Sequence, residues 1–256
     1  KQRHPSTIVP IKGDGKRRPM FAVSGHSGDI YYLLGASRHL HPDQPLIGIQ
    51  PPGLDGGPHM TTLPDLAHYE IGQIKRVQPQ GPYLVCGHCA GGTLAFEIAQ
   101  QLMAAGDKVA MLMLIGAPYP RQFNPVTLEL LRMRRRFKRL TQGSLSEGIT
   151  HVRTRITESL APTQPAAPDA NAESEAARLR VEAASVAAVR AYTPGRFSGI
   201  LDIIVTADTY HRADLWRRHA AAVREHVIPD REIDDLLLGP DAGRIGVVMQ
   251  HRLDAL

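Results

Sequence analysis

Short apolar runs alternate with segments whose apolar residues recur at helical intervals through the first half of the chain. Strands are predicted over 19–25, 45–53, 82–87 and 108–118, and helices over 30–40, 63–79 and 92–106. Continuous apolar strands that alternate with helices are typical of a parallel sheet with helices on both faces. The pattern therefore predicts an α/β fold around a mostly parallel central sheet.

The pattern changes after Tyr119, where the chain becomes mostly helical and basic as far as Gly195. The Ala-, Pro- and Asp-rich stretch 161–177 is predicted to be a mobile surface loop. A helix over 178–194, strands over 199–208 and 225–229, and a C-terminal helix are predicted to follow. With 256 residues and no internal repeat, the whole chain, 1–256, is expected to form a single domain.

The stretch Gly87-His88-Cys89-Ala90-Gly91 stands between a predicted strand and a predicted helix. A nucleophile flanked by glycines in that position is typical of the nucleophile elbow. The following helix points its N-terminus at the nucleophile, where its dipole stabilises a thiolate or an oxyanion. We expect the Ala90 N–H to be one oxyanion donor and the loop "SGHSGD", which holds His26, to supply the second.

Three stretches carry a family resemblance: "PLIGIQPPGLDGG", "QPQGPYLVCGHCAGGTLAFEIAQQLMAAGDKVAMLMLIGAP" and "AYTPGRFSGILDIIVTAD". Through them nearly the whole chain resembles the type I thioesterase domains that terminate polyketide and nonribosomal-peptide assembly lines. The resemblance implies an α/β-hydrolase fold with a helical lid inserted over about 119–190. It also implies that no cofactor is bound directly, and that a carrier domain on the same polypeptide presents an acyl or peptidyl chain as a phosphopantetheine thioester.

Three positions of this chain depart from the pattern of that family. The first is the nucleophile, which is usually Ser in the family and is Cys89 in this chain. The family acid commonly ends the strand after the elbow helix, where this chain has Gly116. The family His follows the last strand in a Val-Pro-Gly-Asp-His-like string, and the matching stretch "VIPDREIDD" has Glu232 in the place of His. The usual acid and the usual base are therefore both missing from their expected positions.

Other residues are candidates for the missing roles. Asp208 ends a predicted strand near where many α/β hydrolases place the acid, although an Asp there also caps turns. Glu232 is a candidate carboxylate base. The candidate histidines, none of which the sequence favours over the others, are His26, His88, His211 and His226.

The chemistry of sulfur makes such losses tolerable. A thiol has a pKa of about 8.5, lower at a helix N-terminus, so a thiolate forms without a dedicated base. Exchange of a phosphopantetheine thioester for a Cys89 thioester is nearly isoenergetic. We therefore favour acyl transfer or cyclisation over plain hydrolysis. A hydrolytic thioesterase with relocated acid and base, a non-catalytic carrier-docking domain, and an engineered Ser-to-Cys exchange are the alternatives, although an engineered chain would normally keep the acid and the base.

The charge and the cysteine content bear on four further possibilities: carrier docking, nucleic-acid binding, metal binding and membrane insertion. The net charge is +5, much of it in 131–139 around Arg134–Arg136, which is either a docking face for an acidic carrier or a solvated lid helix. No nucleic-acid-binding motif accompanies it. Cys86 and Cys89 form a C-x-x-C pair, but no second pair completes a zinc site, so no metal is expected. No apolar run is long enough to span a membrane and no signal-peptide pattern opens the chain, so a cytoplasmic protein is expected.

Overall fold

The computed structural model describes residues 7–124, 126, 170–206, 213–228, 237 and 242–256. The chain divides into one compact unit made of 1–123 and 174–256 and a second made of 124–173. The predicted lid, 119–190, extends across both units, and its part from 127 to 169, with Arg134–Arg136, lies outside the described residues. The lid and the basic docking face therefore stay predictions.

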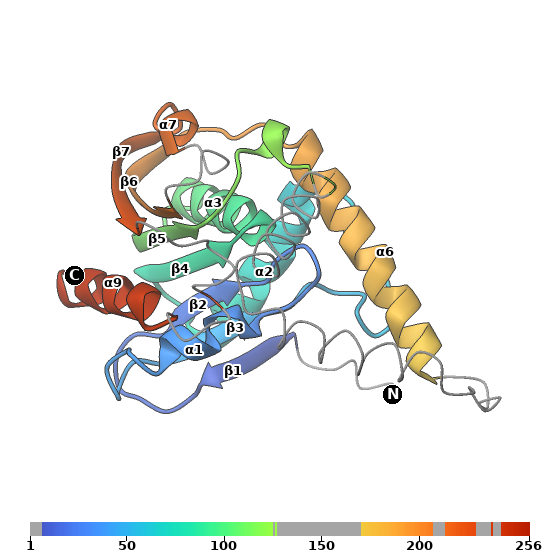
Figure 1. The fold of residues 1–256 in the computed structure, drawn as a ribbon, viewed down its shortest axis with the longest axis horizontal. Helices are drawn as coiled ribbons and strands as arrows, with labels where there is room; N and C mark the ends of the chain where they lie inside the picture. Colours follow the sequence, from blue (N-terminus) through green and yellow to red (C-terminus); the bar gives the residue numbers. More distant parts are fainter. Residues whose placement is uncertain (1–6, 125, 127–169, 207–212, 229–236, 238–241) are drawn as a thin grey trace, which may run out of the picture. The chain divides into compact units, whose positions relative to one another are not determined.

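A seven-stranded sheet in the order β1-β3-β2-β4-β5-β6-β7 forms the centre of the larger unit (Figure 1). Only β1 runs antiparallel to its neighbour, β3, and every other pairing is parallel. The strands are β1 (Ile8–Lys12), β2 (Met20–Val23), β3 (Leu46–Ile49), β4 (Tyr83–His88), β5 (Val109–Ile115), β6 (Phe197–Thr206) and β7 (Ala220–Ile228). The mostly parallel sheet predicted from the apolar runs is confirmed.

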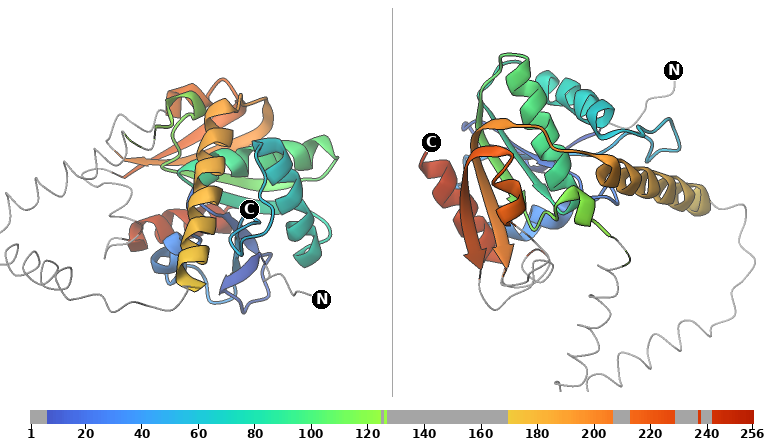
Figure 2. Two further views of the ribbon diagram at one scale, coloured as in Figure 1. Left: turned by 90° about the vertical axis from the view of Figure 1, so that its right-hand side faces the viewer. Right: turned by 90° about the horizontal axis from the view of Figure 1, so that it is seen from above.

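Helices cover both faces of this sheet, as the alternating pattern predicted. The helix α9 lies on one face with α1, and α2 and α3 lie on the other (Figure 2). The helices are η1 (Tyr31–Leu33), α1 (Leu34–Ser37), α2 (Leu63–Val77), α3 (Ala90–Ala104), η2 (Pro120–Gln122), α6 (Ala170–Ala191), α7 (Ala213–Trp216) and α9 (Ala242–Asp254). Among the helices described, none is long and apolar enough to cross a membrane.

Local sequence explains where the principal elements begin. Strands β2 and β4 are buried on both faces, which is why they read as continuous apolar runs. Thr62 caps α2 by accepting a hydrogen bond from the Asp65 N–H, and Pro64 occupies the first turn, where its missing N–H costs nothing. Because β2 to β7 pair in parallel, their carboxyl ends lie at one edge of the sheet, and the helices that follow them begin there.

A missed strand and two shifted boundaries are the main differences from the sequence prediction. The prediction missed β1, because a five-residue edge strand with Pro10 at its centre has no strong strand pattern. The stretch 161–177 was predicted to be a loop, but α6 begins at Ala170, since Ala and Glu favour a helix despite the polar composition. Strand β7 begins at Ala220 rather than 225, because its exposed edge lacks a continuous apolar run.

The helix α2 buries one carboxyl group. Glu70 is 0% exposed, and both of its carboxylate oxygens lack a hydrogen-bond partner among the described residues. Burial raises the pKa of Glu70 well above its ordinary value, because the charged form would lose its hydration. We therefore expect Glu70 to be protonated in the folded chain at pH values where the unfolded chain has lost that proton.

Replacing Glu70 with Gln is expected to remove a pH-dependent penalty. The folded state holds the proton more tightly, so the stability that Glu70 contributes falls as pH rises above about 4.5, the ordinary pKa of a Glu side chain. Glu70→Gln should therefore be more stable than the parent chain at pH 7, by roughly 1 kcal/mol or more, with a smaller difference at pH 4. Melting curves across this pH range measure it. Glu175→Gln, at an exposed carboxylate of α6, is the control, and parallel pH profiles for Glu70→Gln and the parent chain would contradict the expectation.

Candidate active site

Cys89 sits in a strained turn between β4 and α3. Its φ is +53°, and no other non-glycine residue among those described has a positive φ. Its N–H donates to the carbonyl oxygen of Ile115 on β5 at 3.1 Å, and its own carbonyl oxygen accepts from the Gly92 N–H at 3.0 Å. A left-handed backbone at a residue with a side chain costs about 1–3 kcal/mol and persists only where surrounding structure enforces it. The predicted elbow geometry is therefore present, with Cys89 as the N-cap of α3.

The glycines around Cys89 are required by close approach. A methyl group on Gly87 would overlap with the carbonyl oxygen of Gly91, and one on Gly91 would overlap with the carbonyl oxygen of Ser24. A methyl group on Gly92 would meet the side chain of Ala117, after β5. The elbow thus fits against both the loop after β2 and the segment after β5 only because these positions have no side chain.

The two predicted oxyanion residues lie on one small cavity. Ala90 is the first residue of α3, and His26 lies in the loop after β2. Both line a cavity of about 10 Å³, closed on its other sides mainly by apolar residues and by α6; the remaining lining residues are Ser24, Gly25, Pro51, Leu63, Leu66, Gly91, Leu94, Ser185 and Val189. The structure therefore brings the elbow and the predicted oxyanion loop together, while the donor roles of Ala90 and His26 stay predictions.

The two cysteines occupy unlike surroundings. Cys86 is fully buried within β4, and burial raises the pKa of its thiol far above the ordinary range. Cys89 is 6% exposed and caps the N-terminus of α3, where the helix dipole favours a thiolate. Neither cysteine forms a disulfide bond. Cys86 is thus a core residue, whereas Cys89 stands at the N-terminus of a helix, and its role as the nucleophile stays a prediction.

The other predicted partners of Cys89 are only partly visible. Asp208, Glu232 and His211 lie outside the described residues, so their proposed roles stay predictions. Gly116, at the family's acid position, has a φ of +51° and donates its N–H to the carbonyl oxygen of Ile204 at 2.9 Å. That left-handed backbone favours the glycine that the sequence has there.

Two candidate histidines face other partners. The His88 ring packs against the Tyr32 ring, with centroids 5.2 Å apart, on the face that α1 and α9 cover. His226 Nε2 lies 2.9 Å from Oδ1 of Asp202, which also accepts from Arg252 at 2.9 Å. Strand β7 is three strands from β4, or about 14 Å at the usual strand spacing. His226 is therefore part of a buried polar cluster that lies away from Cys89.

Unlike His88 and His226, His26 contacts a carboxylate on α6 beside the elbow. Its Nε2 atom lies 3.5 Å from Oε1 of Glu182, and its ring meets the Phe123 ring edge-on at 6.0 Å between centroids. The sequence analysis did not single out Glu182, since its only signal is a place beside the apolar residues of a helix. Of the histidines described, His26 is the one that lines the cavity beside Ala90.

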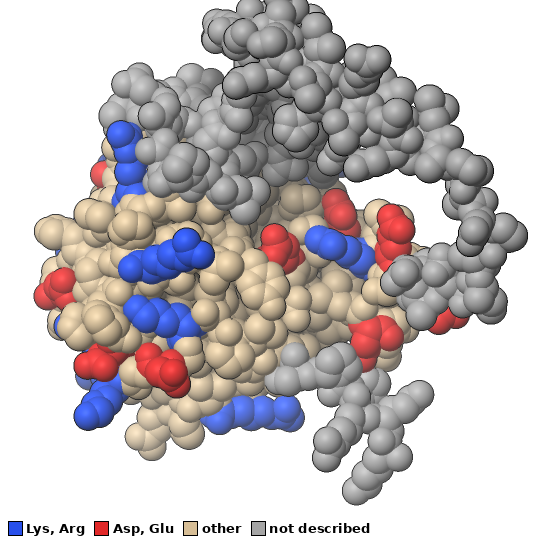
Figure 3. Space-filling view, turned by 60° about the horizontal axis from the view of Figure 1, so that its bottom comes forward, with Lys and Arg blue, Asp and Glu red and all other residues tan. Residues whose placement is uncertain are grey.

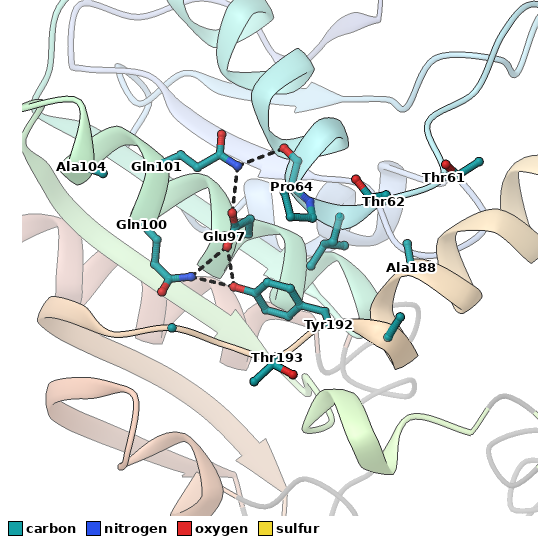
Figure 4. Close-up of a pocket in the computed structure, with 13 residues that line it drawn as sticks. Thr61, Thr62, Pro64, Glu97, Gln100, Gln101, Ala104, Ala188, Tyr192 and Thr193 are labelled. Carbon is teal, nitrogen blue, oxygen red and sulfur yellow. Dashed lines mark hydrogen bonds between the residues drawn. The ribbon is translucent and has the colours of Figure 1, made fainter.

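A polar network fastens the end of α6 to α3 (Figure 4). The hydroxyl of Tyr192, directly after α6, donates a hydrogen bond to Glu97 at 2.5 Å. The side-chain amide of Gln100 donates to Glu97 at 2.9 Å and to the Tyr192 hydroxyl at 2.6 Å. Gln101 donates to Glu97 at 2.8 Å and to the Pro64 carbonyl oxygen at 3.0 Å, which adds the start of α2. These residues line an open cavity of about 690 Å³. The network was not predicted, because residues so far apart in sequence meet only through tertiary packing.

Basic and acidic side chains are mixed on the visible part of the face drawn in Figure 3. Blue and red groups there are separated by wide uncharged areas rather than gathered by sign. The net charge of +5 therefore does not produce a broad basic field on this face of the described chain.

Solved structures share the fold that positions this site. A four-domain nonribosomal peptide synthetase, solved in its holo form with AMP and glycine, matches with a TM-score of 0.74 at 19% identity, over 98% of this chain and 20% of that one. The NocB thioesterase domain, in a covalent complex with a fluorophosphonate nocardicin G analogue, matches with a TM-score of 0.70 at 18% identity, over 96% of this chain and 99% of that one. The chain therefore has the α/β-hydrolase fold.

The family follows from the sequence. The family model described as Thioesterase domain matches residues 20–226, so the chain belongs to the thioesterase domain family. Malpibaldin synthetase of Mortierella alpina is 37% identical over 113 residues, which are 44% of this chain and 2% of that protein. Chondramide synthase of Chondromyces crocatus is 33% identical over 115 residues, or 45% and 3%. An inactive atromentin synthetase of Paxillus involutus is 33% identical over 128 residues, or 49% and 14%, so the chain spans only a small part of these relatives.

Replacing Gly91 with Ala tests the fit of the elbow. The added methyl group would overlap with the carbonyl oxygen of Ser24, so we expect a loss of roughly 2–4 kcal/mol in the free energy of unfolding. Gly72 on α2 is the matched control, because a methyl group there meets nothing within 4 Å. Gly72→Ala should stabilise by about 0.5–1 kcal/mol. Chemical denaturation measures both changes, and equal effects of the two substitutions would rule out the close approach as the cause.

Replacing Tyr192 with Phe tests the attachment of α6. The change removes one donor to Glu97 and leaves the ring in place, so we expect a loss of about 1–2 kcal/mol in stability. Tyr31→Phe is the control, since that side chain is 55% exposed and should change stability by less than about 0.5 kcal/mol. Thermal melting of both variants provides the measurement. Identical melting temperatures would mean that the hydroxyl contributes nothing to holding α6.

Proposed function

We propose that this chain releases a carrier-bound acyl or peptidyl chain by way of a covalent thioester on Cys89. The observation that carries the proposal is the left-handed backbone of Cys89 at the N-terminus of α3, with the Ala90 N–H following it. This arrangement presents a nucleophile and an oxyanion donor to the same point. Membership of the thioesterase domain family supports the reaction class.

The substrate reaches the site as a thioester on the phosphopantetheine of a carrier domain in the same polypeptide. The support is indirect: the curated relatives are named synthetases and synthases, and this chain spans 14% or less of each one quoted above. A thioesterase domain that forms a small part of a long protein can act on an acyl chain bound to a neighbouring domain of the same protein. No cofactor has to bind to the domain itself for this chemistry.

Transfer or cyclisation is proposed as the second step, in preference to hydrolysis. The family acid position is Gly116, and the family base position is Glu232. A Cys thioester reacts readily with amines and carbon nucleophiles, so it can hold the chain until an acceptor other than water arrives. The acceptor is a nucleophile of the bound chain in cyclisation or of a second molecule in transfer.

Two other functions remain as alternatives. Hydrolysis would follow if Asp208 and a histidine reassemble a triad. A non-catalytic docking role has some support, because an inactive atromentin synthetase is among the relatives. The contact geometry of the elbow favours the covalent function, since a chain without catalysis has no need of a strained nucleophile.

Intact-protein mass spectrometry with an acyl-pantetheine thioester tests the proposal. We expect an acyl adduct on the parent chain that persists in the absence of an amine acceptor, no adduct on Cys89→Ala, and an adduct as in the parent on Cys86→Ala. The reason is that Cys89 caps the helix N-terminus whereas the pKa of the Cys86 thiol is raised by burial. Rapid turnover to free acid would favour the hydrolytic function, and absence of both an adduct and free acid with the parent chain would leave only the docking role.

A further inference from the structure

The loop after β2 is fixed against the elbow, so the place of His26 depends on the backbone. The space beside Gly91 is filled by the carbonyl oxygen of Ser24, and a methyl group on Gly25 would lie 4.0 Å from the carbonyl oxygen of His88. His26 follows directly and lines the cavity of about 10 Å³ with Ala90. A space of that size holds about one water molecule. The imidazole therefore shares a cavity with Ala90, the residue that directly follows Cys89.

Two side chains restrain the His26 ring. Glu182 Oε1 lies 3.5 Å from Nε2, and the buried ring of Phe123 meets the imidazole edge-on. The His26 side chain is 17% exposed and that of Glu182 is 36% exposed, so the pair lies at the boundary between the cavity and solvent. At that separation the carboxylate acts on the ring through its charge, and the two contacts together restrain the orientation of the ring.

The helix that carries Glu182 is itself held in place. Ala177, Val181 and Ala188 are buried at helical intervals along α6, and Ser185 and Val189 close the cavity beside Ala90. Tyr192 then fastens the end of α6 to Glu97 on α3. Glu182 therefore approaches His26 from a packed helix rather than from a strand-end loop.

We infer that Glu182 positions His26 to move protons at Cys89, so that a carboxylate from α6 and a histidine from the loop after β2 take over the two missing family roles. The inference rests on the proposed function. The inference assigns the proton of the neutral ring to Nε2, on the side of Glu182, so that Nδ1 carries the lone pair and accepts the proton. Glu182 is a positioning residue because it acts through His26 and touches no reacting atom.

The proton moves twice in this scheme. In acylation the Cys89 thiol gives its proton to Nδ1, the sulfur attacks the thioester carbonyl carbon, and the carbon–sulfur bond to pantetheine breaks, with that proton passing to the departing sulfur. In release the acceptor gives its proton to Nδ1 as it attacks the acyl carbon, and the bond to Cys89 breaks as its sulfur takes the proton back. The oxygen that becomes negative in each step lies at the Ala90 N–H.

The charged groups around His26 define what a change of pH tests. His26 alone titrates among the described residues that line the cavity. Glu182 on α6 is the charged side chain that contacts His26. Asp29 follows three residues later on the same loop, Arg178 lies one turn before Glu182, Arg121 lies two residues before Phe123, and α3 adds the positive end of its dipole.

The pH dependence of Cys89 acylation provides the experiment. The rate of adduct formation from an acyl-pantetheine thioester is measured by mass spectrometry on the full chain with Glu182→Gln, Glu182→Asp and Glu175→Gln. We expect Glu182→Gln to slow acylation at least about tenfold and to move the acid limb of the profile to lower pH, because the charged imidazole loses its carboxylate. Glu182→Asp should recover part of the rate. Glu175→Gln, at an exposed residue seven positions earlier on α6, should behave as the parent chain.

The outcomes separate this inference from the function on which it rests. Acylation of the parent chain at Cys89 with an unchanged rate and pH profile in Glu182→Gln would overturn the role of Glu182 alone. Absence of both an adduct and released acid with the parent chain would overturn the proposed function and this inference together. Equal melting temperatures of the parent and Glu182→Gln, combined with the altered profile, would support the positioning role over a purely structural one.

Discussion

The backbone of Cys89 is the constraint on which the rest of the site depends. A positive φ at a residue with a side chain is unfavourable, so neighbouring structure has to hold it. Part of that hold is the hydrogen bond to Ile115, which exists because β4 and β5 pair in register up to their last residues. The rest is the contact of the elbow with Ser24 and Ala117, which the bare glycines permit. The site is therefore a consequence of how three neighbouring strands end.

The same constraint explains why sulfur suits this chain. A hydroxyl in the elbow needs a strong base before it attacks, whereas a thiol at a helix N-terminus reaches its reactive form with little help. Relaxing that demand also relaxes where a base has to stand. In the proposed mechanism, a histidine on the loop after β2, which packs beside the elbow, takes the part of that base. The loss of the family acid and base and the change of nucleophile are in this view one adaptation rather than three.

Much of this could be predicted from the sequence, because the decisive features are local. The apolar runs of β2 and β4 are buried on both faces, so they read as parallel strands, whereas β1 escaped notice because Pro10 interrupts an exposed edge strand. Cys89 and Ala90 lie in one short motif, and the parallel pairing of β2 and β4 puts the loop that holds His26 at the same edge of the sheet. The contact between Glu182 and His26 could not be predicted, because helical periodicity does not indicate which loop a helix will pack against. The same holds for Tyr192, whose partner Glu97 lies 95 positions earlier.

A carboxylate on a packed helix is held in place by the whole helix, whereas one on a loop is held only by its local contacts. The position of Glu182 follows from the packing of the whole of α6, and that packing depends on the buried stripe and on the Tyr192 network at its end. The same helix borders the cavity beside Ala90 and carries the carboxylate that contacts His26. In the proposed mechanism, one packed helix therefore sets both the wall of that cavity and the orientation of the histidine.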